Sequence, residues 1–385
     1  MRKETVAIRT QSERSQYKEH AAPIYMTSSY AFDDSEEMRA LFSEEKEGNI
    51  YSRYSNPNIS EFIEKMVQLE GAEDGWATSS GMAAVFSTFG ALLKQGDHVV
   101  SCRSVFGSTH KLLTEILPKF GIESSYVDFD DYEGFENAIT QNTKILYLET
   151  PSNPGLDIID LSRISEICKV KNILFIVDNC FATPIIQQPI NHGADVVIHS
   201  ATKYIDGQGR SLGGVILGSR EIIQKVQAFA RHTGPCLSPF NAWLLSKSLE
   251  TLDVRLERHC KNALTIAKWL ENKEEVNWVK YPFLESHPQY ELAKKQMSQG
   301  GGIITFEIKG GIEKGKNFLD RLRMFSLTAN LGDTRSIATH PASTTHSKLS
   351  EEDRIAVGIT DGLIRLSIGL EHVDDILEDI QLALH

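Results

Sequence analysis

Five short β-rich runs, separated by stretches with helical periodicity, constrain the fold of this chain more than any other feature. The runs are HVVSC, KILYLE, ILFIVD, DVVIHS and GGVILG, and all of them lie between residues 49 and 240. Apolar runs of this length are typical of strands buried on both faces, and their alternation with helical segments predicts a mostly parallel sheet covered by helices. We therefore expect a doubly wound α/β domain over 49–240.

The segments on either side of this region have different patterns. Residues 1–48 mix polar residues with isolated apolar ones and show no strand–helix alternation, so we expect an N-terminal arm. From residue 241 the amphipathic stretch NAWLLSKSLETLDVRLERHCKNALTIAKWLE leads into the β-rich runs GGIITFEI and IRLSIGL. This order predicts a smaller α+β domain over 241–385.

The composition limits the location and the partners of the protein. The chain has 385 residues, 41% of them hydrophobic, which is enough for two domains with a large buried core. A formal net charge of -12 argues against general affinity for nucleic acid or for an anionic membrane. No apolar stretch has membrane-spanning length, and the first residues, MRKETVAIRTQSERSQYKEH, lack the apolar core of a signal peptide, so we expect a cytoplasmic protein.

Metal and nucleotide sites are not indicated by the sequence. The five cysteines are widely scattered and show no CxxC spacing, so we interpret them as structural thiols and expect no metal site. No GxGxxG motif follows a first strand, which argues against a dehydrogenase that uses NAD.

Two residues at the ends of neighbouring β-rich runs indicate a specific chemistry. Asp178 ends the run ILFIVD, and Lys203 follows DVVIHSAT one crossover later. Because ligands of open α/β sheets bind beyond the carboxyl ends of the strands, we expect both side chains in one site. A carboxylate can keep a pyridine nitrogen protonated, and a partly buried lysine can form a Schiff base; pyridoxal phosphate (PLP) requires both.

A phosphate site is also expected beside this pair. The run SSGMAAVFSTFGALL, from Ser79 onward, predicts the start of a helix, and Ser200 and Thr202 precede the lysine. Backbone N–H groups at a helix start and small hydroxyl side chains are suited to binding phosphate. Three separate segments are thus expected to converge on one cofactor.

The stretch DVVIHSATKYIDGQG, from Asp195 to Gly209, resembles the lysine signature of the Cys/Met-metabolism PLP enzymes, which include cystathionine γ-synthase, cystathionine lyases, methionine γ-lyase and homoserine-ester sulfhydrylases. The similarity continues in order through YSRYSNPN at Tyr51, SSGMAA at Ser79, ETPSNP at Glu149, VDN at Val177, HPASTTH at His340 and IRLSIGLE at Ile364. This resemblance implies PLP fold type I, with a sheet of the seven-stranded type and helices on both faces.

The resemblance implies roles for individual residues. Lys203, Asp178 and Tyr51 are the expected catalytic residues, and all three are also expected to contact the cofactor. The remaining expected cofactor contacts are Ser80, Gly81, Met82, Phe106, Asn153, Ser200, Thr202 and Arg53. Arg365, Asn153 and Asn330 are expected to bind the substrate, Arg365 through the α-carboxylate.

The resemblance also implies an oligomer. In this family the residues that match Tyr51 and Arg53 enter a neighbouring subunit's site and hold its phosphate. We therefore expect the N-terminal arm to contribute to the oligomer and to the neighbouring active site. The expected assembly is a homotetramer built as a dimer of dimers.

Two departures from the commonest family pattern bear on the reaction. A Phe-Gly pair at Phe106 stands where most members have Tyr-Gly, so ring stacking is kept and a phenol hydroxyl is lost. Acid–base work then falls to Lys203, to another tyrosine such as Tyr51, or to solvent. Asn-Leu-Gly from Asn330 replaces the Ser-Leu-Gly of many members. The combination of the runs SVFGST, GQGR and ANLGDT makes the chain most similar to the O-succinylhomoserine sulfhydrylase branch.

The implied reaction is γ-replacement on an O-acylhomoserine, with sulfide giving homocysteine for methionine biosynthesis. Cystathionine γ-synthase and O-acetylhomoserine sulfhydrylase are alternatives, as are γ-lyases and β-lyases of the same family, because one cofactor apparatus serves all of them. A non-catalytic scaffold would have lost Lys203, Asp178 or Arg365, and all three are present. The additional carboxylate of a succinyl ester needs a cation, for which the candidates are Arg103, Lys111 and Arg210.

Overall fold

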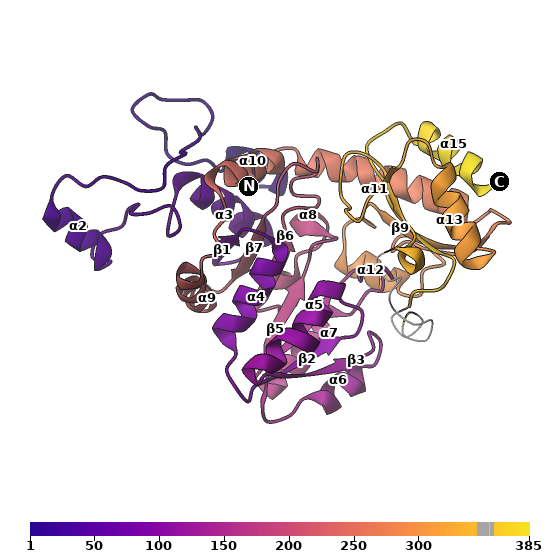
Figure 1. Cartoon of the computed structure of the whole chain (residues 1–385), viewed down its shortest axis with the longest axis horizontal. Helices are drawn as coiled ribbons and strands as arrows, with labels where there is room; N and C mark the ends of the chain where they lie inside the picture. Colours follow the sequence, from indigo (N-terminus) through magenta and orange to yellow (C-terminus); the bar gives the residue numbers. More distant parts are fainter. Residues whose placement is uncertain (345–353, 355–357) are drawn as a thin grey trace.

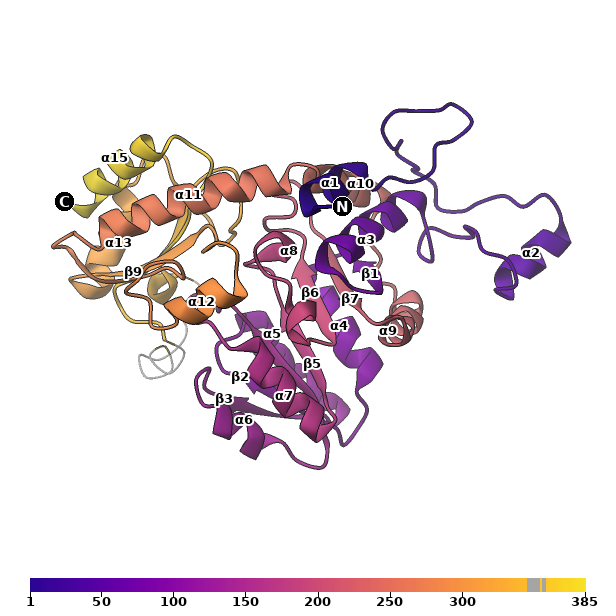
Figure 2. The ribbon, with the colours of Figure 1, turned by 180° about the vertical axis from the view of Figure 1, so that it is seen from behind.

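Two β-sheets, each covered by helices, make up the body of the protein (Figure 1). The computed structural model describes residues 1–344, 354 and 358–385. The larger sheet occupies one half of the body and the smaller sheet the other, and helix α11 (Leu252–Leu270) runs between the two halves (Figure 2). The last two residues of the HPASTTH motif, 345 and 346, lie outside the described residues.

The larger sheet has seven strands in the order β1-β7-β6-β5-β4-β2-β3. The strands are β1 (Asp74–Thr78), β2 (His98–Cys102), β3 (Glu123–Val127), β4 (Thr143–Glu149), β5 (Leu174–Asp178), β6 (Val196–Ser200) and β7 (Gly214–Gly218). Strands β2 to β6 are parallel to one another, whereas β7 is antiparallel to both of its neighbours, β1 and β6. All five predicted β-rich runs form strands of this sheet, so the predicted mostly parallel sheet is confirmed.

Helices cover both faces of this sheet (Figures 1 and 2). They are α3 (Pro57–Glu70), α4 (Gly81–Leu92), α5 (Gly107–Lys111), α6 (Tyr132–Ala138), α7 (Leu161–Lys171), α8 (Thr183–Ile186), α9 (Arg220–Thr233) and α10 (Pro239–Leu249), with the shorter helices η1 (Leu112–Ile116), η2 (Leu117–Phe120) and η3 (Pro189–His192). One hydrophobic core joins the strands to α4, α7 and α9, and a second joins them to α3, α8 and α10. Burying the strands on both faces explains their continuous apolar sequence.

The smaller sheet has the strand order β10-β11-β12-β9-β8. Its strands are β8 (Val276–Lys280), β9 (Ile303–Ile308), β10 (Ser326–Leu327), β11 (Ile337–Thr339) and β12 (Leu363–Ser367), accompanied by α12 (Tyr290–Gln296), α13 (Gly311–Arg321), η4 (Pro341–Ser343) and α15 (Val373–Leu384). A third hydrophobic core packs this sheet against α11, α13 and α15. The predicted smaller α+β unit is therefore present, whereas the domain boundaries at residues 48 and 240 stay a prediction.

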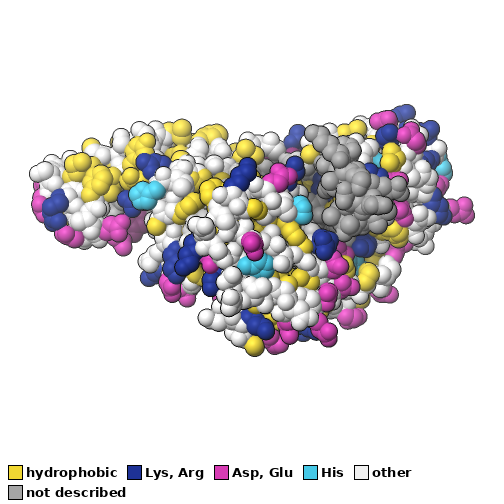
Figure 3. Space-filling view, turned by 60° about the horizontal axis from the view of Figure 1, so that its bottom comes forward, with side chains coloured by type: hydrophobic (Ala, Val, Ile, Leu, Met, Phe, Trp, Pro, Cys, Tyr) yellow, Lys and Arg dark blue, Asp and Glu magenta, His cyan; other side chains and the backbone are white. Residues whose placement is uncertain are grey.

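The N-terminal segment projects from the body as an arm (Figures 1 and 2). Helix α1 (Lys3–Arg9) packs on the body against α3, and α2 (Ser35–Phe42) lies near the tip of the projection. The arm carries exposed apolar side chains, among them Tyr17, Met26, Met38 and Phe42. In Figure 3 hydrophobic side chains gather over this projection at the left. Among the described residues, no helix combines the length and apolar character needed to cross a membrane.

Candidate active site

The carboxyl ends of β4, β5 and β6 bring together the first group of candidate residues. Glu149 of β4 pairs in register with Asp178 of β5, and Asp178 pairs with Ile198 of β6. Lys203 follows β6 in a turn, where its N–H donates to the Ser200 carbonyl at 3.3 Å. The structure thus places Asp178 and Lys203 at the same edge of the sheet.

The carboxylate of Asp178 is held by two donors. Its Oδ1 accepts the Cys180 N–H at 3.0 Å, and its Oδ2 accepts the Tyr147 hydroxyl at 3.3 Å. Burial raises the pKa of Asp178, and the Cys180 N–H, His199 and Lys203 act in the opposite direction. The side chain keeps part of its surface accessible. An accessible carboxylate in such surroundings suits a cationic partner, as the protonated ring nitrogen of PLP would be.

The amine of Lys203 faces the other half of the molecule. Its Nζ donates to Asn330 Oδ1 at 2.7 Å. Burial lowers the pKa of Lys203 below the ordinary lysine value, and the nearby charge of Arg365 acts in the same direction. A lysine whose neutral form is favoured in this way is suited to nucleophilic attack on an aldehyde.

Arg255 of α11 fixes the turn that carries Lys203. Its guanidinium is buried and donates to the carbonyls of Tyr204 at 2.7 Å and Ile205 at 3.2 Å, and to the Ser248 carbonyl at 3.0 Å. Sequence reasoning missed this residue because a charged residue in an amphipathic helix is usually solvated. The available signal was its position three residues after Leu252, on the apolar face of α11.

The N-terminus of α4 offers backbone donors to an anion. Ser80 is the N-cap residue, and its Oγ accepts the Ala83 N–H at 3.1 Å. The N–H groups in the first turn of a helix have no acceptor within the helix, so those of Gly81 and Met82 are available to a phosphate at the positive end of the helix dipole.

Ser200 and Thr202 lie beside this helix start. A Cβ atom on Gly81 would lie 2.6 Å from Ser200 Cβ, so only glycine allows the helix start and the end of β6 to approach so closely. The Thr202 Oγ1 donates to the Gly213 carbonyl at 3.4 Å, which fixes the hydroxyl in the same turn. This arrangement fits a phosphate held between the α4 N-terminus and the two hydroxyl groups.

Phe106, the residue expected to stack on the cofactor ring, is fixed by a carboxyl group. Its N–H donates to Glu149 Oε2 at 2.8 Å, and the residue is 44% exposed. Burial raises the pKa of Glu149 well above its ordinary value, and the neighbouring Asp178 adds to this. Sequence reasoning assigned no role to Glu149 or to Tyr147. Their signal was two residues with polar groups at i and i+2 in the second half of β4, which places them on one face.

Arg365 of β12 forms hydrogen bonds with the other two residues that are expected to bind the substrate. Its Nη1 donates to Asn153 Oδ1 at 3.1 Å and its Nη2 to the Asn330 carbonyl at 3.2 Å. Within the described chain, the buried Nε of Arg365 has no hydrogen-bond partner. Burial lowers the pKa of Arg365 to about 10. A buried guanidinium with an unsatisfied donor fits a carboxylate ligand.

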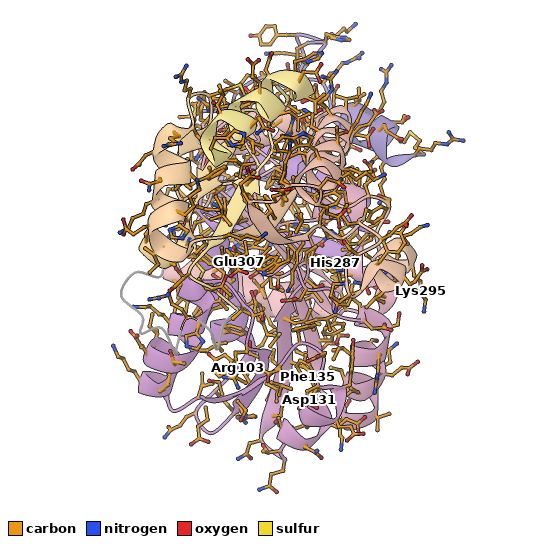
Figure 4. The ribbon with its side chains drawn as sticks, turned by 90° about the vertical axis from the view of Figure 1, so that its right-hand side faces the viewer. Arg103, Asp131, Phe135, His287, Lys295 and Glu307 are labelled. Carbon is orange, nitrogen blue, oxygen red and sulfur yellow. The ribbon has the colours of Figure 1, made fainter. Side chains whose placement is uncertain are left out.

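The loop that carries Asn153 is held from the smaller sheet. Thr305 of β9 donates to the Pro154 carbonyl at 2.7 Å, and His287 lies 3.2 Å from the Leu156 carbonyl. Lys280 of β8 pairs with Asp157 at 3.1 Å. Figure 4 looks at this end of the molecule and shows His287 beside the smaller sheet, above Arg103 of the larger-sheet half. Both halves therefore position the site.

In the described part of the chain, Tyr51 and Arg53 make contacts that are separate from the site around Lys203. The Arg53 guanidinium lies over the rings of Tyr54 and Tyr51, 4.8 Å and 5.4 Å from their centres, and it donates to the Arg231 carbonyl. Tyr51 forms an isolated bridge with Ser29 in the arm. None of these contacts involves the residues around Lys203 within the described part of the same chain.

The three candidate cations for a succinyl group already pair with carboxylates. Arg103 pairs with Asp128 at 2.9 Å, and Lys111 approaches Glu115 at 3.8 Å; all four side chains are at least 41% exposed. Arg210 differs, because it pairs with buried Asp206 at 3.1 Å and donates to Ser248 Oγ at 2.6 Å. Exposed ion pairs of the first kind contribute about 0 to 1 kcal/mol, so a ligand carboxylate can displace them.

Comparisons with known proteins identify the family of this chain. A family model described as Cys/Met metabolism PLP-dependent enzyme matches residues 4–385. An O-succinylhomoserine sulfhydrylase of Pseudomonas aeruginosa is 47% identical, covering 99% of this chain and 94% of that protein. An L-methionine gamma-lyase of Fusobacterium nucleatum is 44% identical, covering 99% and 97%. A solved Campylobacter jejuni structure with N'-pyridoxyl-lysine-5'-monophosphate is 36% identical, covers 100% of both chains and has a TM-score of 0.96. The matches confirm the expected fold and the PLP cofactor.

Proposed function

Because the chain belongs to the Cys/Met metabolism PLP-dependent enzymes, we propose that it is a transferase that replaces the γ-acyloxy group of an O-acylhomoserine, preferentially O-succinylhomoserine. Sulfide is the sulfur donor, and the Cγ–O bond is replaced by a Cγ–S bond, which gives homocysteine and succinate. The similarity to O-succinylhomoserine sulfhydrylases supports the acyl group and the donor.

Three connected hydrogen bonds support this proposal. Lys203 donates to the Asn330 side chain, the Asn330 carbonyl accepts from Arg365, and Arg365 donates to Asn153. The base and the carboxylate anchor of an amino-acid substrate are thereby held in one rigid network. Such pre-positioning is what proton removal from a bound amino acid requires.

PLP, when bound, supplies an electron sink for the charge that develops at the substrate Cα. Asp178 would hold a proton at the pyridine nitrogen, and the Cys180 N–H and the Tyr147 hydroxyl keep its carboxylate in place. Lys203 anchors the cofactor and, as the free amine, removes the Cα proton and later returns one. Its lowered pKa favours the neutral base.

Arg365 binds the substrate α-carboxylate with its guanidinium fork. Its buried Nε supplies a donor that no residue of the described chain accepts. Asn153 keeps the fork oriented through the bond to Nη1 at 3.1 Å. Because Phe106 has no hydroxyl, the proton transfers at Cα and Cβ are assigned to Lys203, with Tyr51 of a neighbouring subunit as a further acid–base group.

The succinyl carboxylate is assigned to Arg103 or Lys111. Both are exposed and hold only displaceable ion pairs, with Asp128 and Glu115 respectively. Arg210 is not assigned, because its pairing with buried Asp206 and its bond to Ser248 keep it in the turn.

The active form is proposed to be a homotetramer, a dimer of dimers, in the cytoplasm. Tyr51 contacts Ser29 of the arm, and Arg53 contacts Tyr51 and Arg231; in the described part of their own chain these contacts are separate from those of Lys203. An arm with exposed apolar side chains is suited to burial against a second copy of the chain.

A γ-lyase is the second candidate, because an L-methionine gamma-lyase is 44% identical over 383 residues. Elimination would end in 2-oxobutanoate and ammonia instead of a new C–S bond. The experiment that separates the two gives the PLP-loaded protein O-succinylhomoserine or O-acetylhomoserine, each with sulfide, with cysteine or with no nucleophile. We expect mainly homocysteine from the succinyl ester and sulfide. Cystathionine as the main product would indicate a synthase, and 2-oxobutanoate under every condition would indicate a lyase.

A further inference from the structure

Three acidic groups lie close together at the carboxyl ends of β4 and β5. Tyr147 and Glu149 alternate on β4 and share one face of the sheet, and Asp178 lies opposite Glu149 on β5. Glu149 is 3% exposed and Tyr147 is fully buried. We call Tyr147, Glu149 and Asp178 the acid cluster. The mechanism above uses Asp178 and the Tyr147 hydroxyl, and it leaves Glu149 without a role.

Two neighbouring carboxyl groups in such surroundings do not both ionise. Removing a carboxylate from water and placing a second one beside it both favour the protonated form of one partner. Burial and mutual repulsion therefore favour a proton on one of the two carboxyl groups, and the hydrogen bonds of each carboxyl group indicate which one.

The contacts favour charge on Asp178 and a proton on Glu149. Asp178 accepts the Cys180 N–H and the Tyr147 hydroxyl, and both donors stabilise an anion. Among the described residues, Glu149 accepts one donor, the Phe106 N–H, at its Oε2. This bond needs only a carbonyl oxygen, so Oε1 is left to carry a proton.

The charged and titratable groups around Glu149 come from several elements. Tyr147 lies on its own strand, Cys102 ends β2, Asp178 and Cys180 follow along β5 and its loop, and Arg365 comes from β12. His199 and Lys203, on and after β6, act on Asp178. Arg365 favours an ionised Glu149, whereas Asp178 and burial oppose it. Arg365 is already committed to Asn153 and Asn330.

We propose that Glu149 is a positioning residue kept as a neutral carboxylic acid. It leaves Asp178 as the single negative charge of the acid cluster, and it anchors the backbone of Phe106 so that the aromatic ring is held over the cofactor. The inference rests on the proposed site but not on the proposed reaction, because it concerns a proton and a hydrogen bond of the protein itself.

The proton can be measured without turnover. We would record infrared difference spectra between wild type and Glu149→Gln near neutral pH, once without cofactor and once with PLP bound. The matched control is Glu166→Gln, which replaces an exposed glutamate on α7. The expected result is a carboxylic-acid C=O band that Glu149→Gln removes and Glu166→Gln keeps. A wild-type protein that shows only a carboxylate band for this residue overturns the proposal.

The pH dependence of folding gives a second readout. A carboxyl group whose pKa is raised on folding stabilises the folded state at low pH, and this contribution is lost as the pH rises from the unfolded value toward the folded one. The wild-type folding constant should therefore fall by up to tenfold per pH unit above about pH 4.5 relative to Glu149→Gln. Equal pH dependence of the two proteins in urea unfolding contradicts a buried neutral acid.

The positioning role is separated from simple packing by three variants. Glu149→Gln keeps a carbonyl acceptor for the Phe106 N–H, so PLP retention and the PLP absorption spectrum should match wild type within about twofold. Glu149→Ala and Glu149→Asp should release PLP at least tenfold more readily, because the acceptor is lost or withdrawn. If Glu149→Gln loses PLP as readily as Glu149→Ala, the residue is needed as a charge and the proposal fails. The result is independent of whether the enzyme makes homocysteine.

Discussion

Replacing Gly81 by alanine adds one methyl group at the start of α4, where the chain has no room for it. The new Cβ would lie 2.6 Å from Ser200 Cβ and 2.9 Å from its Oγ. Ordinary carbon contacts begin at about 3.5 Å, so the helix start and the end of β6 must separate by about 1 Å. The phosphate donors of Gly81 and Met82 would move away from the hydroxyl groups of Ser200 and Thr202.

Overpacking of this kind costs about 1 to 3 kcal/mol. If the strain is relieved by opening the phosphate site, PLP should bind about 5- to 150-fold more weakly. Equilibrium dialysis with absorbance detection of bound PLP gives the dissociation constant, and urea unfolding of the cofactor-free protein reports whether the fold itself has changed.

Gly107→Ala is the matched control, because it is also the first residue of a helix at the site. No atom of the residues that the structure describes lies within 4 Å of its ideal Cβ, so the substitution should leave PLP affinity unchanged and stabilise α5 slightly. Equal PLP affinity of wild type and Gly81→Ala would refute the phosphate site at the α4 N-terminus.

Further predictions concern the other parts of the site. Arg365→Lys should raise KM for the amino-acid substrate at least tenfold with PLP still bound, since a point charge cannot replace the guanidinium fork; an unchanged KM in steady-state kinetics would contradict this. Arg53→Ala should lose PLP more readily without unfolding, and mixing it with Lys203→Ala should restore activity in hybrid oligomers; inactive mixtures would argue against shared sites. In the cofactor-free protein, Lys203 should be acylated at lower pH than exposed Lys111, because burial lowers its pKa; identical pH profiles by mass spectrometry would contradict that.

Much of the fold was predictable because buried strands leave a strong sequence pattern. All five β-rich runs form strands, and their apolar character follows from burial on both faces. Strand β3 was missed, since it lies at the edge of the sheet and only Val127 is buried. The antiparallel direction of β7 could not be predicted, because a run of apolar residues does not indicate the direction of its strand.

Site residues were predictable where a residue type suited to the chemistry stands at the end of a predicted strand. Asp178 and Lys203 stand at strand ends, where ligands of α/β sheets bind. The Glu149 contact with Phe106 and the Arg255 contacts with the lysine turn required coordinates, because each joins residues far apart in sequence. Likewise, the pairing of Arg103 and Lys111 with exposed carboxylates, which bears on the acyl preference, depends on side-chain placement.

Product formation from isotope-labelled sulfide tests the central claim most directly. The PLP-loaded protein is given O-succinylhomoserine with labelled sulfide, and labelled homocysteine and 2-oxobutanoate are quantified by mass spectrometry, with Lys203→Ala as the background. A γ-replacement enzyme should yield labelled homocysteine as the main product, and Lys203→Ala should yield none. Formation of 2-oxobutanoate at one rate with and without sulfide, and no labelled homocysteine, would contradict the proposed function.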